Sequence, residues 1–88
     1  MADYSITFAR SARKELERLS PEIVARVIGK VETLSENPRP VGATKLRGQK
    51  NLWRLRVGDY RVIYSIDDTT SAVDVSIVRH RREVYRGL

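Results

Sequence analysis

The chain has 88 residues, 41% of them hydrophobic, which predicts one small globular domain over residues 1–88. It contains no cysteine and one histidine, which excludes a disulfide scaffold and argues against a metal site. An apolar run of about 18 residues and a signal peptide are both lacking, so we expect a cytoplasmic protein with no membrane contact. The net charge is +6, and residues 45–88 carry ten Lys/Arg against five Asp/Glu, so five of the six excess charges lie in the second half.

The first half of the chain predicts one strand followed by two helices. Residues 4–8 alternate in polarity and are rich in β-forming side chains, which indicates a strand. Apolar residues then recur at helical spacing over 11–19. Residues 20–22, Ser-Pro-Glu, are typical of a helix start, and a second apolar stripe follows over 24–34. The prolines of 37–40 end this helix. We expect the two helices to form an α-hairpin over one face of a sheet.

The second half predicts an antiparallel meander. Residues 52–57 and 60–66 are strands joined by a two-residue turn at Gly58-Asp59. A looser turn leads to a last strand over 72–78, and the short basic segment 79–88 ends the chain. Apolar residues expected on one side of the last strand are Val73, Val75 and Ile77. The predicted fold is therefore α+β, with the order β-α-α-β-β-β and an antiparallel sheet covered on one face.

The two-residue turn also determines which side chains face each other. Leu55 lies opposite Val62 on the face that the helices must cover. On the other face Arg56 lies directly opposite Arg61, with Arg54 two residues along. Like charges at opposed strand positions cost up to about 1 kcal/mol, and no acidic residue on these strands is placed to offset them. Since stability explains this pair poorly, we interpret the face as one that binds a polyanion; a merely solubilising basic face is the alternative.

The C-terminal segment adds further charge next to a tyrosine. Arg79, Arg81 and Arg82 follow the last strand, and Tyr85 comes three residues later. A phenol has an ordinary pKa of about 10, too high for a base at neutral pH. Several nearby guanidinium groups would favour the phenolate and lower that pKa. Taken alone, Tyr85 is more simply a ring that packs to hold the segment in place.

Four segments, in this order, resemble the RelE toxins of bacterial and archaeal toxin–antitoxin pairs. They are 44–48 (Thr-Lys-Leu-Arg-Gly), the paired Arg54 and Arg56, 58–64 (Gly-Asp-Tyr-Arg-Val-Ile-Tyr) and 79–85 (Arg-His-Arg-Arg-Glu-Val-Tyr). The resemblance extends over nearly the whole chain, since the predicted order of elements is also that family's. It implies a ribosome-dependent endoribonuclease that enters the ribosomal A site and cuts mRNA there, without a cofactor.

The resemblance also implies roles for five residues. The best-known members carry two lysines where this chain has Arg54 and Arg56, arginines that match Arg61 and Arg79, and a tyrosine that matches Tyr85. In this hypothesis Tyr85 removes the proton of the RNA 2′-hydroxyl. Arg54, Arg56 and Arg61 stabilise the charge that develops on the phosphate, and Arg79 acts at the leaving 5′-oxygen. Arginine in place of lysine keeps the charge but changes geometry and proton transfer, which affects rate and codon preference more than reaction type.

Further residues are expected at or near this site. His80, with an ordinary pKa of about 6.5, could share the acid or base role. Arg81 is a possible catalytic residue or phosphate contact. Residues expected to bind RNA or the ribosome are Lys45, Arg47, Lys50 and Arg82.

Two other functions stay open at this point. ParE-like toxins share the fold but inhibit DNA gyrase and cut nothing, and they generally lack the basic and tyrosine residues described above. A non-catalytic RNA-binding module is the third class, although the few aromatic residues make a base-stacking platform weak.

The resemblance implies several partners. The first is a cognate, RelB-like antitoxin whose acidic or wrapping segment would cover the fold, block ribosome entry or displace the C-terminal segment. The others are mRNA and the A site of the 30S subunit with its 16S rRNA. Operator DNA would be reached only through the antitoxin.

Overall fold

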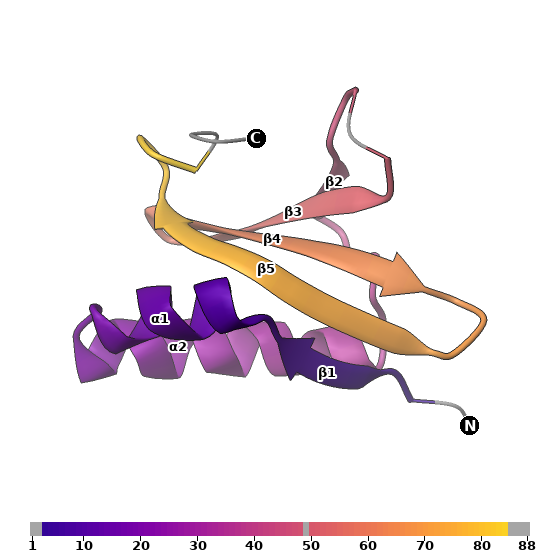
Figure 1. Ribbon diagram of the computed structural model, residues 1–88, viewed down its shortest axis with the longest axis horizontal. Helices are drawn as coiled ribbons and strands as arrows, with labels where there is room; N and C mark the ends of the chain where they lie inside the picture. The colour runs from indigo at the N-terminus through magenta and orange to yellow at the C-terminus, as the bar shows by residue number, and fades with distance from the viewer. Residues whose placement is uncertain (1–2, 49, 85–88) are drawn as a thin grey trace.

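A five-stranded mixed sheet with two helices on one face makes up the fold (Figure 1). The computed structural model describes residues 3–48 and 50–84. The elements in chain order are β1 (Ser5–Phe8), α1 (Arg10–Glu17), α2 (Pro21–Glu32), the 3-10 helix η1 (Thr33–Ser35), β2 (Thr44–Lys45), β3 (Leu52–Val57), β4 (Tyr60–Asp67) and β5 (Ala72–His80). Within these ranges no helix is both long and apolar enough to span a membrane.

The predicted α+β order is confirmed, and the sheet order is β1-β5-β4-β3-β2. Strands β3, β4 and β5 form the antiparallel meander that was expected, and β2 also pairs antiparallel with β3. Strand β1 instead joins β5 in parallel, with Ser5 opposite Ala72 and Phe8 opposite Val75. A strand that is followed by a long helical crossover has no tight turn to impose an antiparallel direction. The two-residue strand β2, at the far edge, was not predicted.

A bulge in β5 changes which of its side chains are buried. Ile77 pairs with Ile63, whereas Val75 pairs with the residue that follows Ile63, so Ser76 is an extra residue on β5. Val78 therefore joins the core, where it is 2% exposed. The prediction that Ile77 shares a side with Val75 was wrong, because the bulge shifts the alternation by one residue.

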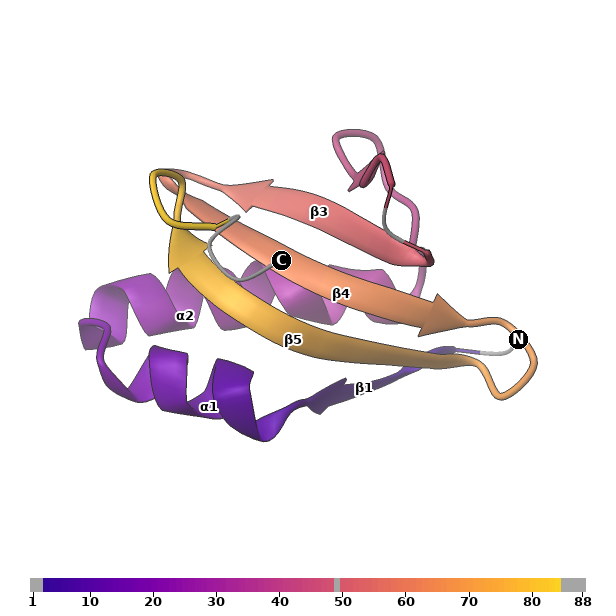
Figure 2. The same cartoon turned by 45° about the horizontal axis from the view of Figure 1, so that its top comes forward.

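Local sequence explains where the helices begin. Helix α2 has Ser20 as its N-cap, whose hydroxyl accepts a hydrogen bond from the Ile23 N–H at 3.4 Å. Pro21 and Glu22 occupy its first turn, which is where both residue types favour a helix. Helix α1 has no side-chain cap; instead the Ala9 N–H before it donates to a β5 carbonyl at 2.8 Å. Figure 2 shows α1 alongside β5, and α2 beneath the neighbouring strands.

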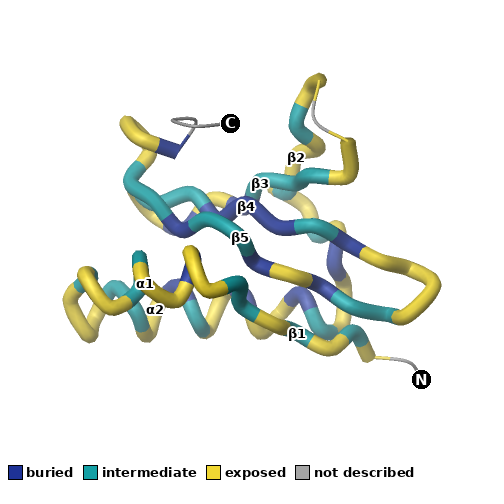
Figure 3. Tube along the Cα trace, viewed as in Figure 1, coloured by how far each residue is buried: buried dark blue, intermediate teal, exposed yellow. Residues whose placement is uncertain are grey.

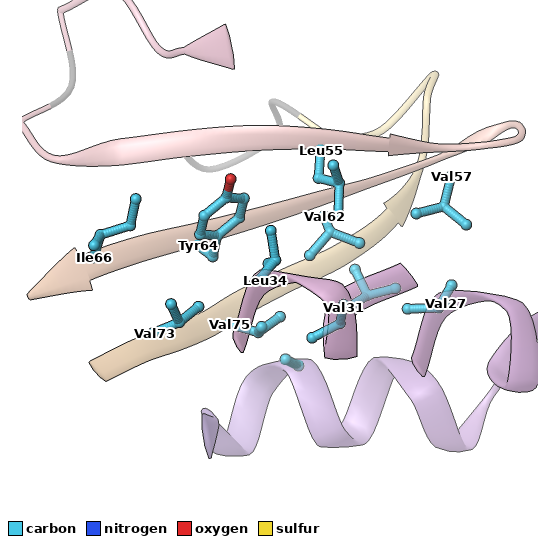
Figure 4. Close-up of a cluster of buried hydrophobic side chains, with 12 residues drawn as sticks. Val27, Val31, Leu34, Leu55, Val57, Val62, Tyr64, Ile66, Val73 and Val75 are labelled. Carbon is cyan, nitrogen blue, oxygen red and sulfur yellow. The ribbon is translucent and has the colours of Figure 1, made fainter. Parts of the chain in front are cut away.

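The core lies between the sheet and the helices. Figure 3 shows its buried residues along the central strands and the inner sides of the helices. The fully packed members are Ala12, Val27, Val31, Leu34, Leu55, Val57, Val62, Tyr64, Ile66, Val73, Val75 and Val78 (Figure 4). The buried Tyr64 hydroxyl donates to the Pro38 carbonyl at 2.7 Å, and burial raises the pKa of Tyr64 to about 12. That bond fixes the loop between η1 and β2 to the centre of the sheet.

Candidate nucleic-acid interface

Arginines follow one another across the face of the sheet opposite the helices. Arg56 on β3 pairs with Arg61 on β4, and Arg61 pairs with Arg79 on β5. Arg54 shares this face and pairs with Ile63. The predicted register of β3 and β4 is thus confirmed, including the opposed arginines. The structure brings together three of the predicted site residues, Arg54, Arg56 and Arg61. The backbone of Arg79 lies in line with Arg56 and Arg61 across the strands, and these positions are called the arginine row.

Arg61 lies at the centre of this positive charge. Burial is the main cause that lowers the pKa of its guanidinium, and the charges of Arg56, Arg54 and Arg81 lower it further. Its Nη1 donates to two carbonyl oxygens of the adjoining β3–β4 turn, each at 2.9 Å. These carbonyls hold the guanidinium in place without neutralising it. An anion bound here would relieve the repulsion among the four arginines.

The turn after β5 brings Arg81 to this group. The Arg81 N–H donates to the Asp59 carbonyl, and the Glu83 N–H to the His80 carbonyl, each at 2.8 Å. Residues 81–84 form this turn beyond the end of β5 (Figure 2). Val84 is only 1% exposed although it lies outside the main core, so it anchors this turn. Tyr85, the predicted base, lies outside the described residues.

Arg79 extends toward α1. Its Nε donates to Glu15 Oε2 at 2.5 Å, and Glu15 Oε1 accepts the Val78 N–H at 3.0 Å. The two side chains are 30% and 20% exposed, so solvent screens this ion pair only in part. The Ser11 hydroxyl, one turn earlier, donates to the Ser76 carbonyl at 2.8 Å. Helix α1 thereby covers the edge of β5 beyond the end of β1.

Glu15 is a residue that sequence reasoning missed. Its helical pattern marks it as one of several charged positions on α1, and nothing local indicates that it reaches a strand 63 residues away. The charge of Arg81 is one of those that lower the pKa of Arg61. Arg79 is the direct cross-strand partner of Arg61 on β5.

His80 lies on the helix-covered side. It pairs with Tyr60, and the two rings meet edge to face with centroids 5.6 Å apart. Its Nδ1 accepts the Arg82 N–H at 3.3 Å. Because neighbouring residues of a strand point to opposite faces, the structure does not bring His80 to the row that Arg79 starts in. It supports instead the turn that carries Arg81.

The other predicted RNA-binding residues are exposed, in two places. Lys45, Arg47 and Lys50 surround an open hollow in the β2–β3 connection, together with Leu46 and Gly48. Figure 1 shows this connection projecting on the side of the sheet away from the helices. Arg82 is exposed in the turn after β5.

An open groove of about 560 Å³ lies beside the arginines. It is lined by Lys30, Val41, Gly42, Arg54, Leu55, Arg56, Gly58 and Arg61. Lys30 comes from α2 and was not predicted, because helical spacing identifies it only as a solvent-facing residue. Gly58 has φ +58°, a backbone conformation that favours glycine, and its Cα lies close to the Arg26 guanidinium. Among residues 3–48 and 50–84, no group of three His, Cys, Asp or Glu side chains is arranged to hold a metal ion.

This chain is similar in sequence and in fold to known toxins. A family model described as the ParE toxin of the type II toxin–antitoxin system parDE matches residues 6–85. Toxin RelG of Mycobacterium tuberculosis is 36% identical over 84 residues, covering 94% of this chain and 97% of that toxin. The RelE–RelB complex of Pyrococcus horikoshii has a TM-score of 0.79 at 27% identity, covering 90% of this chain and 96% of that one. The toxin–antitoxin complex RelBE2 of Mycobacterium tuberculosis also has a TM-score of 0.79, at 33% identity, covering 90% and 99%.

Proposed function

The chain belongs to the RelE/ParE superfamily of toxins of type II toxin–antitoxin systems, and from this premise we propose that it is a ribosome-dependent endoribonuclease. It cuts mRNA in the ribosomal A site and thereby inhibits translation. The observation that carries this proposal is the group of like charges around Arg61, with Arg56 directly opposite it on the next strand. Such a cluster of like charges does not stabilise the fold, but it would stabilise the negative charge that develops on a phosphodiester in the transition state of cleavage.

Cleavage by the RNA 2′-hydroxyl needs a base, positive charge at the phosphate and an acid for the leaving oxygen. Arg54, Arg56 and Arg61 supply the positive charge from β3 and β4. Arg81 adds to it from the turn after β5, because its charge acts directly on Arg61. Tyr85 as the base stays a prediction. A catalytic part for Arg79 requires that its guanidinium acts while Glu15 holds Nε.

The basic residues of the β2–β3 connection would contact the ribosome. The exposed Lys45, Arg47 and Lys50 bind 16S rRNA phosphates at the 30S A site, and Arg82 adds one contact from the other side of the arginine row. The chain acts in the cytoplasm, where its substrate is.

A cognate antitoxin is the protein partner. Two solved structures of similar chains are complexes of a RelE-type toxin with its antitoxin. An acidic antitoxin segment suits the +6 chain, since it would neutralise the arginines that receive RNA. Operator DNA is contacted through that antitoxin.

Gyrase inhibition is the second candidate. The family model that matches residues 6–85 is described by a ParE toxin, which favours this function independently of the arginines. In that case the arginine cluster would contact a protein or DNA without catalysis.

One experiment separates the two functions. The purified toxin is added to a reconstituted translation reaction, and mRNA 5′ ends are mapped; a supercoiling assay with gyrase runs in parallel. We expect codon-phased cuts that disappear with Arg61→Ala and with Tyr85→Phe, and that persist with Lys14→Gln, an exposed position on α1. Inhibited supercoiling with intact mRNA would establish the ParE-like function instead. Cuts that survive both site substitutions would refute the assignment of the site.

A further inference from the structure

The groove beside the arginines continues over the edge of the sheet. A second hollow, of about 420 Å³, is lined by Ala25, Arg26, Gly29, Lys30, Thr33, Arg56, Val57 and Gly58. It shares Arg56, Gly58 and Lys30 with the first. The two hollows adjoin at these three residues and are here named together the β3-edge groove, which has lining residues on β3, β4 and α2.

The edge of β3 is open along this groove. Strand β2 pairs only with Trp53 and Arg54, so among the described residues no strand pairs with β3 from Leu55 to Val57 on that side. A neighbouring strand would otherwise fill the space between the arginine row and α2. Both hollows lie beside this part of β3, since Arg56 and Gly58 line each of them.

The walls of the groove are cationic or small. Its charged lining residues are Arg26, Lys30, Arg54, Arg56 and Arg61, and none of the described residues that line it is acidic. At Gly29 and Gly42 a Cβ would meet no heavy atom within 4 Å, so both positions border open space. Apolar anchors are few: Val41 is the one large hydrophobic side chain that stands exposed among the described residues.

We propose that the β3-edge groove binds the single-stranded RNA that continues from the cleaved bond, with Lys30 as a phosphate contact. This inference rests on the proposed function, because the strand enters from the arginine row. A polyanion with one charge per nucleotide matches a row of separate cations, whereas a folded protein partner would need a larger apolar surface than Val41 provides. Arg26 lies farther along the same path on α2.

The test is the salt dependence of RNA binding by the full chain. A labelled, unstructured RNA of about ten nucleotides is titrated with toxin at several NaCl concentrations, and affinity is followed by fluorescence anisotropy. Each lost phosphate contact lowers the slope of log K against log salt by about 0.7 for single strands. We expect this decrease for Lys30→Gln and none for Lys14→Gln. Both substitutions remove one charge from an exposed lysine on a helix, but Lys14 lies outside the groove.

Two further variants and one competitor make the outcomes distinct. Arg56→Gln and Arg61→Gln should weaken RNA binding more than Lys30→Gln does. If they weaken it while Lys30→Gln behaves like Lys14→Gln, the groove proposal is overturned and the proposed function stands. If neither arginine variant affects RNA binding, the proposed function fails as well. If Lys30→Gln weakens binding of poly-glutamate but not of RNA, the groove is a site for an acidic protein.

Discussion

Replacing Arg56 by glutamine should make the fold more stable and the protein less active. The Arg56 side chain is exposed and lies directly opposite Arg61, whose pKa is already lowered by burial and by three neighbouring arginines. Arg56→Gln removes one of these charges and keeps a side chain that can still form hydrogen bonds. The repulsion it relieves exists only in the folded state, since the unfolded chain separates the two strands.

The size of the effect follows from the geometry of the pair. Cross-strand charge pairs contribute roughly 0.2–1 kcal/mol, and exposure of Arg56 places this pair in the lower half of that range. We therefore expect a gain of about 0.5 kcal/mol in the free energy of unfolding at low salt, or roughly 2–4 °C in Tm for a domain of this size. At 1 M salt the screening length falls to about 3 Å, and the gain should largely vanish.

Urea unfolding followed by tryptophan fluorescence at about 0.05 M and 1 M NaCl measures this difference. Arg18→Gln is the control: Arg18 caps the C-terminus of α1, where positive charge is favourable, so its loss should destabilise slightly. Loss of stability in Arg56→Gln at low salt, or a gain that salt does not change, would refute the view that repulsion is concentrated at this site.

Three further experiments probe other elements of the fold. A double-mutant cycle of Glu15→Ala and Arg79→Ala should give a coupling of about 1 kcal/mol, because the ion pair is only partly screened. Asp68→Asn should reduce the pH dependence of the free energy of unfolding in acid. The hydrogen bond with Arg39 lowers the pKa of Asp68 to about 2, so this bond stabilises the fold above pH 4 and the stabilisation is lost as pH falls toward 2. Val84→Ala should cost about 1–2 kcal/mol in stability and reduce mRNA cleavage, because it removes the buried anchor of the last turn.

Each of these has a result that would contradict it. Additive effects in the cycle would mean that Glu15 and Arg79 do not act together. Identical stability curves of wild type and Asp68→Asn between pH 4 and 2 would contradict the lowered pKa. Full stability in Val84→Ala would show that the turn is held by its backbone bonds alone.

The sequence was sufficient to predict strand register and a helix start where residues close in the chain determine them. Gly58 and Asp59 alone separate the two strands, so the pairing of Arg56 with Arg61 could be counted from this turn. Alternation of side chains then assigned Arg54 to the same face. The start of α2 was likewise predictable, because its N-cap Ser20 accepts a hydrogen bond from a residue only three positions later.

The sequence was insufficient to predict contacts between segments that lie far apart in the chain. The parallel direction of β1 and the extra residue in β5 depend on how the helices pack, and no local signal marks Ser76 as a bulge. Glu15 reaches Arg79 for the same reason, and Lys30 of α2 lines the same hollow as the arginines of β3 and β4. In each case the missing information is the position of a helix relative to the sheet.

Arg39, Arg79 and Arg61 differ in the acceptors that hold their side chains. Arg39 forms two hydrogen bonds with the Asp68 carboxylate and lies 5.3 Å from the Trp53 ring centroid, so it ties the loop before β2 to the β4–β5 turn. Arg79 is paired in the same way with a carboxylate of α1. Arg61 is held through Nη1 by two carbonyl oxygens, which carry no formal charge and so leave the charge of the guanidinium available to a ligand. That difference in acceptors, rather than arginine content, separates side chains that hold the fold together from those suited to bind a phosphate.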